Sequence, residues 1–476
     1  MSMIAYFAGL KLPWLLGIAT LAAVRDTRRS PDTPGEIAWI VGAGYLAGAF
    51  MLTLWMRALS LAGMRFGVLA IGAPVLLATV VLACIAWRRH GRAAVVGATL
   101  GALRALIAPP QAARTVRIAW QLLLAWMMIR YALLALEVIW QPLYPWDAWI
   151  QWATKARVWY EQGRIVPFAR SDAWFAAGGG VWFDASPEYP PTVPLLQVWA
   201  CIALGRWDDV LMNAPWWQFS AALTLAVYGA LRSRAIGALA ALVGAFLVAS
   251  LPLANVHVAL AGYADLPMAA YYTGATLAFL RWTESRSLRD AGVALFLALA
   301  CTQIKIPGFV WALTLLPGVI VALLPRQGPK LVVIGFALAL FGLAVLAQTS
   351  PVVFNYRLHL DFDPAWRALV ETHFLLSNWH LLWYAAIVAA LLAWRELASP
   401  ALTPLTVVVA TGGLFLVVVF SFTNARLWVT EQTTINRATL HIAPLAAVFA
   451  VLAFRAYAAR WSASRPVTQG SALPSA

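Results

Sequence analysis

Charged residues are scarce in this chain. Asp, Glu, Lys and Arg make up 11% of its 476 residues, whereas 62% are hydrophobic. A soluble domain has no interior large enough to hide so much apolar surface, but a lipid bilayer takes it directly. The scarcity therefore excludes an ordinary soluble enzyme and predicts an all-α polytopic membrane protein. The 25 Trp residues fit that environment, since indole rings favour the headgroup level of a membrane.

The sequence also has few cysteines and no nucleotide-binding signature. Cys84, Cys201 and Cys301 lie in or beside apolar segments without CxxC spacing, so we expect neither a disulfide nor a thiolate metal site. The sequence has no Walker-type glycine loop or kinase signature that would suggest nucleotide use. It shows no internal repeat. The N-terminus has no charged segment before its first apolar run, so we predict a helix that stays in the membrane.

Acidic residues are outnumbered by basic ones, 19 to 34, which gives a formal charge of +15. In a membrane protein, cationic cytoplasmic loops explain such an excess better than nucleic acid does, so no nucleic-acid partner is expected. The basic residues gather at alternate ends of the apolar segments, the pattern of the positive-inside rule. This pattern predicts a bacterial inner-membrane protein with a periplasmic N-terminus and a cytoplasmic C-terminus.

Apolar windows of about 17–25 residues predict about thirteen membrane spans. They lie near 4–24, 37–58, 66–87, 117–140, 210–231, 235–256, 266–281, 287–303, 307–324, 331–348, 381–397, 402–422 and 439–457. Two long external loops result, at about 141–209 and 349–380. Within the first, the apolar segment 192–205 is predicted to be a short helix lying in the membrane interface. We divide the chain into 1–110, which has no assigned role, a module 111–350, a C-terminal part 351–460 and a disordered cytoplasmic tail 461–476.

Titratable residues gather at the predicted external ends of the spans. Asp147 lies in Tyr144-Pro145-Trp146-Asp147-Ala148-Trp149, directly after the span 117–140, and an acid at such a position is expensive to place without a use. Two residues are the catalytic candidates, Asp147 and Glu188. The substrate-binding candidates are Trp146, Trp149, Lys155, Tyr189, Asp265, Lys305, Arg437 and His441. Arg437 and His441 are four residues apart and so share one helix face.

Each candidate also has a plainer explanation. Asp265 could cap a helix N-terminus, and Lys305 could extend to the lipid headgroups. Arg437 could hold a lipid phosphate at the membrane rim, and Lys155 could serve only to solvate its loop. The Trp residues near Asp147 could be ordinary interface anchors. These explanations do not account for so many titratable groups at helix ends on one side of the membrane.

Transfer from a lipid-phosphate donor fits this set of residues. A carboxylate in a partly dehydrated loop can act as a general base on an acceptor hydroxyl. Cations at the membrane level can hold the phosphate of the donor and stabilise it as it leaves. Because ATP does not supply energy outside the cell, a preactivated lipid-linked donor is the natural source.

In this order, the residues resemble the GT-C superfamily of polyprenyl-phosphate-sugar-dependent glycosyltransferases. The nearest likeness is to glycosyltransferase family 39, which holds protein O-mannosyltransferases and lipid A aminoarabinose transferases. The features that match are Asp147 after a span, the element Glu188-Tyr189-Pro190-Pro191, Asp265 at a later helix end and Lys305 at a two-helix turn. The likeness covers about 117–350, with a looser match in 436–445.

The resemblance implies a GT-C-like helix bundle and an inverting transfer with Asp147 as base. It also implies a polyprenyl-phosphate sugar as donor and a glycan, lipid or protein acceptor at the periplasmic face. Two departures mark a divergent member with an unusual acceptor. Ala148 stands where the family has a second acid, so we expect Glu188 to supply that second acidic group. Tyr189 stands where the aminoarabinose transferases have a Lys, which leaves the phosphate to Lys305 or Arg437.

Two other functions remain open. A transporter or flippase of a lipid-linked sugar would use the same cations and aromatic residues, but it favours broken helices, repeats and charges near the midplane, where Arg130 is the most conspicuous. An O-antigen ligase or polymerase would place its chemistry in the loop 349–380. The sequence specifies no cofactor. A divalent metal stays open, because Asp147, Glu188 and His441 could converge on one although no ligand spacing supports it.

Overall fold

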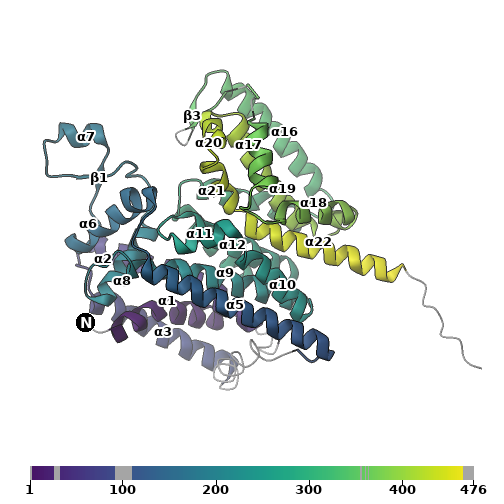
Figure 1. Ribbon diagram of the computed structural model, residues 1–476, viewed down its shortest axis with the longest axis horizontal. Coiled ribbons are helices and arrows are strands. Elements are labelled where there is room, and N and C mark those ends of the chain that lie inside the picture. Colours follow the sequence, from purple (N-terminus) through teal and green to yellow (C-terminus); the bar gives the residue numbers. More distant parts are fainter. Residues whose placement is uncertain are drawn as a thin grey trace, which may run out of the picture.

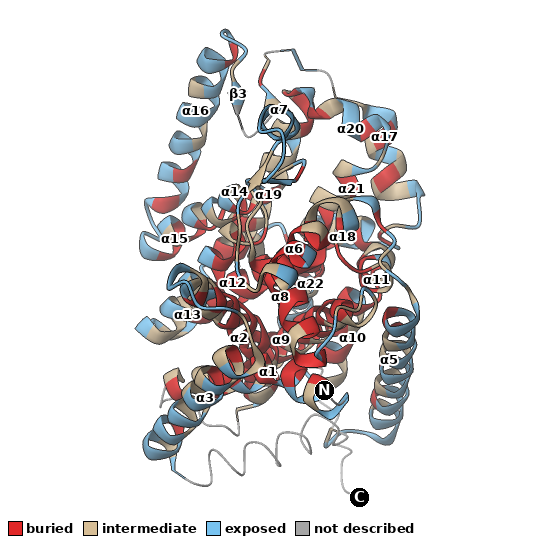
Figure 2. Ribbon diagram, turned by 90° about the vertical axis from the view of Figure 1, so that its left-hand side faces the viewer, coloured by how far each residue is buried: buried red, intermediate tan, exposed pale blue. Residues whose placement is uncertain are grey.

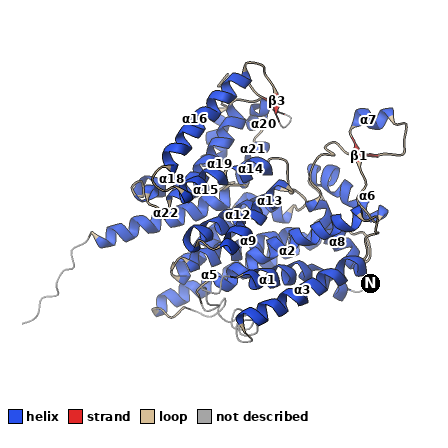
Figure 3. Cartoon of the chain, turned by 180° about the vertical axis from the view of Figure 1, so that it is seen from behind, coloured by secondary structure: helices blue, strands red, loops and turns tan. Residues whose placement is uncertain are grey.

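A computed structural model describes residues 3–25, 33–91, 110–353, 356–359, 361–362 and 364–464. These residues form an all-α protein in which the only strands are two pairs of two-residue strands (Figure 3). The predicted tail 461–476 falls mostly outside the described residues, and so does most of the predicted loop before Arg114. The all-helical prediction is confirmed.

The elements are numbered in chain order, and Figure 1 labels many of them. The first helices are α1 (Met3–Val24), α2 (Glu36–Leu61), α3 (Val68–His90) and α5 (Arg114–Trp140). The long loop that follows holds η2 (Ala148–Ala153), α6 (Thr154–Gln162), β1 (Phe168–Ala169), α7 (Ser171–Ala176), β2 (Trp182–Phe183), α8 (Thr192–Leu204) and η3 (Leu211–Asn213).

The middle of the chain is a series of helices joined by short turns. They are α9 (Ala214–Ser233), α10 (Ala238–Ala249), α11 (Pro252–Ala259), α12 (Asp265–Ser285), α13 (Leu288–Thr302), α14 (Gly308–Leu313), α15 (Leu315–Leu323) and α16 (Gly328–Ala347). The C-terminal part has β3 (Val352–Val353), β4 (Tyr356–Arg357), α17 (Trp366–Val370), η4 (Glu371–Leu375), α18 (Leu382–Leu392), η5 (Glu396–Ala398), α19 (Thr403–Ser421), η6 (Asn424–Arg426), α20 (Leu427–Thr430), α21 (Thr434–Leu440) and α22 (Ala443–Ala463).

Among the described residues, seven helices are long and apolar enough to cross a membrane: α1, α2, α3, α5, α16, α19 and α22. The count rises to eight if α10 and α11 form one span, bent by 60°. The protein is thus a multi-pass membrane protein, but the thirteen predicted spans are not confirmed. Helices occur at all thirteen positions, yet several are too short, such as the 11-residue α18, or too polar, such as α12.

The core of the bundle is formed by α1, α2, α9 and α12, which pack against one another and are largely buried in Figure 2. By contrast, 11% or less of the apolar windows of α3, α5 and α16 is buried by protein. These exposed apolar faces suit contact with lipid tails. At one end of the core, Glu36 on α2 accepts two hydrogen bonds from Arg281 on α12, at 2.9 and 2.7 Å, and both side chains are buried.

The segment 192–205 forms a helix as predicted, but its surroundings differ from the prediction. Almost every residue of α8 is buried by protein, and Trp199 donates a hydrogen bond to the Gly9 carbonyl of α1 at 2.9 Å. A helix lying in the membrane interface would keep one face for lipid. A run of apolar residues cannot distinguish a lipid-facing helix from a protein-covered one, and for this reason the interfacial prediction was wrong.

Candidate functional site

Asp265, the first residue of α12, is the centre of a buried ionic cluster. Its side chain has no exposed surface, and its carboxylate accepts from three groups. The partners are Lys305 Nζ at 2.6 Å, His441 Nε2 at 2.9 Å and Arg437 Nε at 2.8 Å. A buried carboxylate needs such partners to stay charged. With both oxygens occupied, Asp265 acts as an organiser of its neighbours.

Arg437, on α21, connects the two aspartates of the cluster. While its Nε donates to Asp265, its Nη1 donates to Asp147. The guanidinium also lies over the ring of Tyr263, 4.3 Å from the ring centroid. Planar guanidinium groups suit this combination of two carboxylates and an aromatic face. Arg437 is therefore fixed on three sides.

Asp147 is the accessible acid of the cluster. Its side chain is 28% exposed, and Arg437 is its only side-chain partner among the described residues. It lies between the end of α5 and η2, a turn that packs against the loop preceding α12. Gly262 permits this contact, since a Cβ there would lie 2.5 Å from the Cβ of Ala148, and its φ of +115° disfavours other residues. The close approach brings Asp147 beside Asp265.

Lys305 reaches the cluster from the tight turn between α13 and α14. Gly308 closes this turn, because a Cβ there would lie 1.9 Å from the Cys301 carbonyl oxygen. Burial lowers the pKa of the Lys305 ammonium below its ordinary value, although Asp265 acts in the opposite direction. The ion pair with Asp265 thus keeps a desolvated cation in place.

His441 completes the cluster from the segment between α21 and α22. Because an ionised carboxylate only accepts, the hydrogen bond to Asp265 places the donated proton on Nε2. Nδ1 is buried and has no hydrogen-bond partner. Trp311 packs edge-on against the ring at a centroid distance of 5.7 Å. The structure therefore brings five predicted residues together: Asp147, Asp265, Lys305, Arg437 and His441.

A second polar centre lies in the long loop. Lys155 and Asp184 are both almost fully buried and form an ion pair at 3.3 Å. Lys155 also donates to the Ser186 carbonyl at 2.7 Å, and the Ser186 amide donates to Asp184 at 2.7 Å. Burial lowers the pKa of Lys155 and raises the pKa of Asp184. This geometry makes Lys155 an internal anchor of the segment 184–186.

Tyr189 lies between the two centres. Its ring packs on Trp152 at 5.1 Å and faces the Lys155 ammonium at 5.8 Å. Burial raises the pKa of its phenol, with further contributions from Tyr356 and Asp265, so the hydroxyl stays neutral. Glu188, in contrast, is 32% exposed and pairs with Arg170 at 2.7 Å. Glu188 therefore lies beside the Lys155–Asp184 pair rather than beside the Asp147–Arg437 pair.

The two predicted Trp residues are on the surface. Trp146 and Trp149 contact each other at a centroid distance of 5.1 Å and are 63% and 44% exposed. They flank Asp147 in sequence, at the end of the lipid-facing α5. This placement suits either an anchor in the headgroup layer or a platform for a ligand that approaches Asp147.

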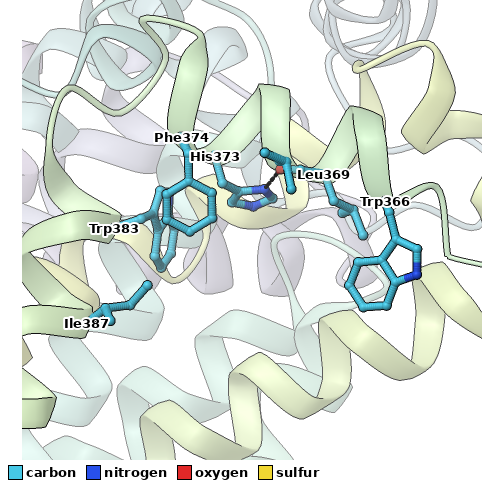
Figure 4. Close-up of a pocket in the computed structure, with 7 residues that line it drawn as sticks. Trp366, Leu369, His373, Phe374, Trp383 and Ile387 are labelled. Atoms are coloured by element: carbon cyan, nitrogen blue, oxygen red, sulfur yellow. Dashed lines mark hydrogen bonds between the residues drawn. The ribbon is translucent and has the colours of Figure 1, made fainter.

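An aromatic pocket lies beside α21. Trp366, Leu369, Val370, His373, Phe374, Trp383 and Ile387 line it (Figure 4). His373 bonds the Leu369 carbonyl through Nδ1 at 2.8 Å and contacts Thr439 through Nε2 at 3.2 Å. Burial lowers the pKa of His373, which keeps it neutral. The seven lining residues therefore form a pocket without a charged group.

Sequence reasoning missed Asp184 and Tyr263. Tyr263 stands two residues before Asp265 in the sequence, and this closeness of an aromatic residue to an acid was its only signal. Asp184 had no signal, because its burial depends on its contact with Lys155 of α6. Among the described residues, no group of three His, Cys, Asp or Glu side chains could hold a metal ion.

No protein-family model matches the sequence, and no curated protein or solved structure matches it either.

Proposed function

We propose that this protein is an integral-membrane glycosyltransferase that moves a sugar from a polyprenyl-phosphate donor to a hydroxyl acceptor at the external face. The unequal environments of Asp147 and Asp265 carry the proposal. Asp265 is saturated by three donors, whereas Asp147 is partly exposed and, within the described part of the chain, is bound by Arg437 alone. A general base needs an accessible carboxylate of the second kind.

The proposed reaction is a single inverting displacement. The acceptor oxygen attacks the anomeric carbon while Asp147 takes the hydroxyl proton. The bond between that carbon and the phosphate oxygen breaks, and polyprenyl phosphate leaves with the electron pair. Lys305 and Arg437 contribute positive charge beside the leaving phosphate. Asp265 positions both cations, and His441 fixes the orientation of Asp265.

The test is transfer from a radiolabelled polyprenyl-phosphate sugar to envelope acceptors by the purified full chain in nanodiscs. Asp147→Asn retains the shape of the side chain but cannot take a proton, so transfer should fall about 10²–10⁴-fold. Asp172→Asn, an exposed acid on α7 in the same loop, is the matched control and should leave transfer unchanged. Activity of Asp147→Asn within about threefold of wild type would remove Asp147 as the base.

One observation favours a second candidate, a transporter of a lipid-linked sugar. The pair α10 and α11 is bent by 60° at Ser250–Pro252, and broken helices line the substrate sites of many transporters. In proteoliposomes, such a transporter would move the lipid-linked sugar across the membrane equally well as the wild type and as the Asp147→Asn variant. The glycosyltransferase would show transfer without net translocation.

A further inference from the structure

Arg57 is a cation that the proposed reaction does not use, and it contacts the turn that holds Lys305 through Gln303. It lies on α2, one turn before the helix ends at Leu61. Its Nη1 donates to Gln303 Oε1 at 2.7 Å, and its Nη2 donates to Thr192 Oγ1. Gln303 precedes Lys305 by two residues, and Thr192 follows Tyr189 by three. Arg57 therefore joins the two segments that hold Lys305 and Tyr189.

The partners of Arg57 are neutral. None of the acidic side chains in the described part of the chain lies within ion-pair distance of its guanidinium. Its Nε is buried and has no hydrogen-bond partner. A half-buried guanidinium without a counter-charge inside a membrane bundle costs desolvation free energy. Such residues usually bind a ligand.

The charge of the cluster itself shows what Arg57 can do. Two carboxylates, Asp147 and Asp265, balance the cations of Lys305 and Arg437, while His441 carries its proton on Nε2 as a neutral ring. A lipid phosphate that enters this balanced set adds negative charge. The proton that Asp147 takes compensates the charge that the phosphate gains as the sugar leaves, so the charge brought in by the donor stays unbalanced. An additional cation must offset it.

We propose that Arg57 binds the phosphate group of a lipid-linked donor, next to Lys305. The inference rests on the proposed function for the identity of the donor. Gln303 and Thr192 support it, because an amide and a hydroxyl can turn from acceptors of Arg57 protons into donors to phosphate. Arg guanidinium groups bind phosphate oxygens in a planar, two-point geometry. The N-terminal helices, which contain α2, thereby gain a role in substrate binding.

Binding without turnover tests this proposal. The full chain in nanodiscs is titrated with undecaprenyl phosphate, with uncharged undecaprenol and with inorganic phosphate, and binding is followed by native mass spectrometry. Arg57→Met should weaken binding of undecaprenyl phosphate on the order of 10- to 100-fold and leave undecaprenol unchanged. Arg57→Lys keeps the charge and should lose less. Arg65→Met, an exposed Arg at the same end of α2, is the control and should bind like wild type.

The outcomes separate the possibilities. If folded Arg57→Met binds undecaprenyl phosphate within twofold of wild type, Arg57 is only a structural link between α2, α8 and α13, and the proposal fails. If inorganic phosphate binds at Arg57 but undecaprenyl phosphate does not, the lipid-linked part fails. Should Arg57→Met not fold, Arg57→Gln is used, since it is uncharged yet can still bond Thr192, and the same expectations hold.

The same experiment distinguishes this proposal from the proposed function. Wild-type chain that binds undecaprenyl phosphate through Arg57 but transfers no sugar would reject the glycosyltransferase and keep the phosphate site. Transfer that persists while Arg57→Met retains full donor binding would keep the enzyme and reject the site.

Discussion

Arg437 and Asp265 are 172 positions apart in the chain, and their side chains are joined by a hydrogen bond of 2.8 Å inside the protein. This contact attaches the segment before the last helix to the start of α12. Because Arg437 also binds Asp147, a single guanidinium connects three distant parts of the sequence.

Removal of Arg437 should therefore affect both stability and transfer. Arg437→Met leaves Asp265 buried with one strong cation fewer, and breaking a buried ion pair typically costs about 3–5 kcal/mol. We expect a lower thermal midpoint and loss of transfer. Arg437→Lys should recover only part of both, since an ammonium cannot bridge two carboxylates in one plane. Arg357→Met, an exposed Arg of β4, should match wild type in both measurements.

The two aspartates should respond differently to the same substitution. Asp265→Asn leaves Lys305 and Arg437 without their shared buried negative charge and should lower the unfolding free energy by about 3–5 kcal/mol. Asp147→Asn, at a partly exposed position, should fold normally and lose transfer. Thermal unfolding and transfer measured side by side check this. Equal destabilisation by both variants would contradict the assignment of separate roles.

Gly262 should not tolerate a side chain. Gly262→Ala combines a left-handed φ of +115° with a clash against Ala148, so η2 must move away from α12. Gly179→Ala is the matched control, because Gly179 has a φ of +120° but nothing within 4 Å of its would-be Cβ. Backbone strain alone costs about 1–3 kcal/mol. Transfer should fall for Gly262→Ala only, and loss in both variants would mean that strain, not the clash, is responsible.

The pair of Lys155 and Asp184 should behave as one unit. Lys155→Met alone leaves Asp184 buried without its cation and should destabilise the protein by about 3–5 kcal/mol. The double variant Lys155→Met with Asp184→Leu removes both charges and should regain much of that loss. A double-mutant cycle in thermal unfolding measures the coupling. Additive effects of the two single changes would show that the ion pair is not coupled.

Topology can be checked independently of chemistry. Reporters fused after Gly178, in the long loop, and after Ser464, beyond α22, should read as periplasmic and cytoplasmic, respectively. The distribution of basic residues is the physical reason for this expectation. If both reporters lie on the same side of the membrane, the prediction that Asp147 faces the external side is wrong.

The sequence could predict the helical class and the residues of the ionic cluster, because acids and bases at the ends of apolar segments are visible in any single chain. It could not predict that Arg437 contacts both Asp147 and Asp265, since such contacts depend on how distant helices pack. Glu188 was chosen for its neighbours Tyr189 and Pro190, yet only Tyr189 faces the cluster. The thirteen spans stay unconfirmed, because hydropathy does not separate helices that touch lipid from short or polar helices that other helices cover.

The buried pair of Glu36 and Arg281 has a consequence for biogenesis. The helix α12 carries Asp265 at one end and Arg281 near the other, with Thr273 and Thr276 buried between them. Such a helix is a weak signal for lateral release from the translocon by itself, because each charge opposes partition into lipid. We expect α12 to leave the translocon only together with α2, which supplies Glu36 as counter-charge. A nascent chain that lacks α2 would then leave α12 outside the bilayer.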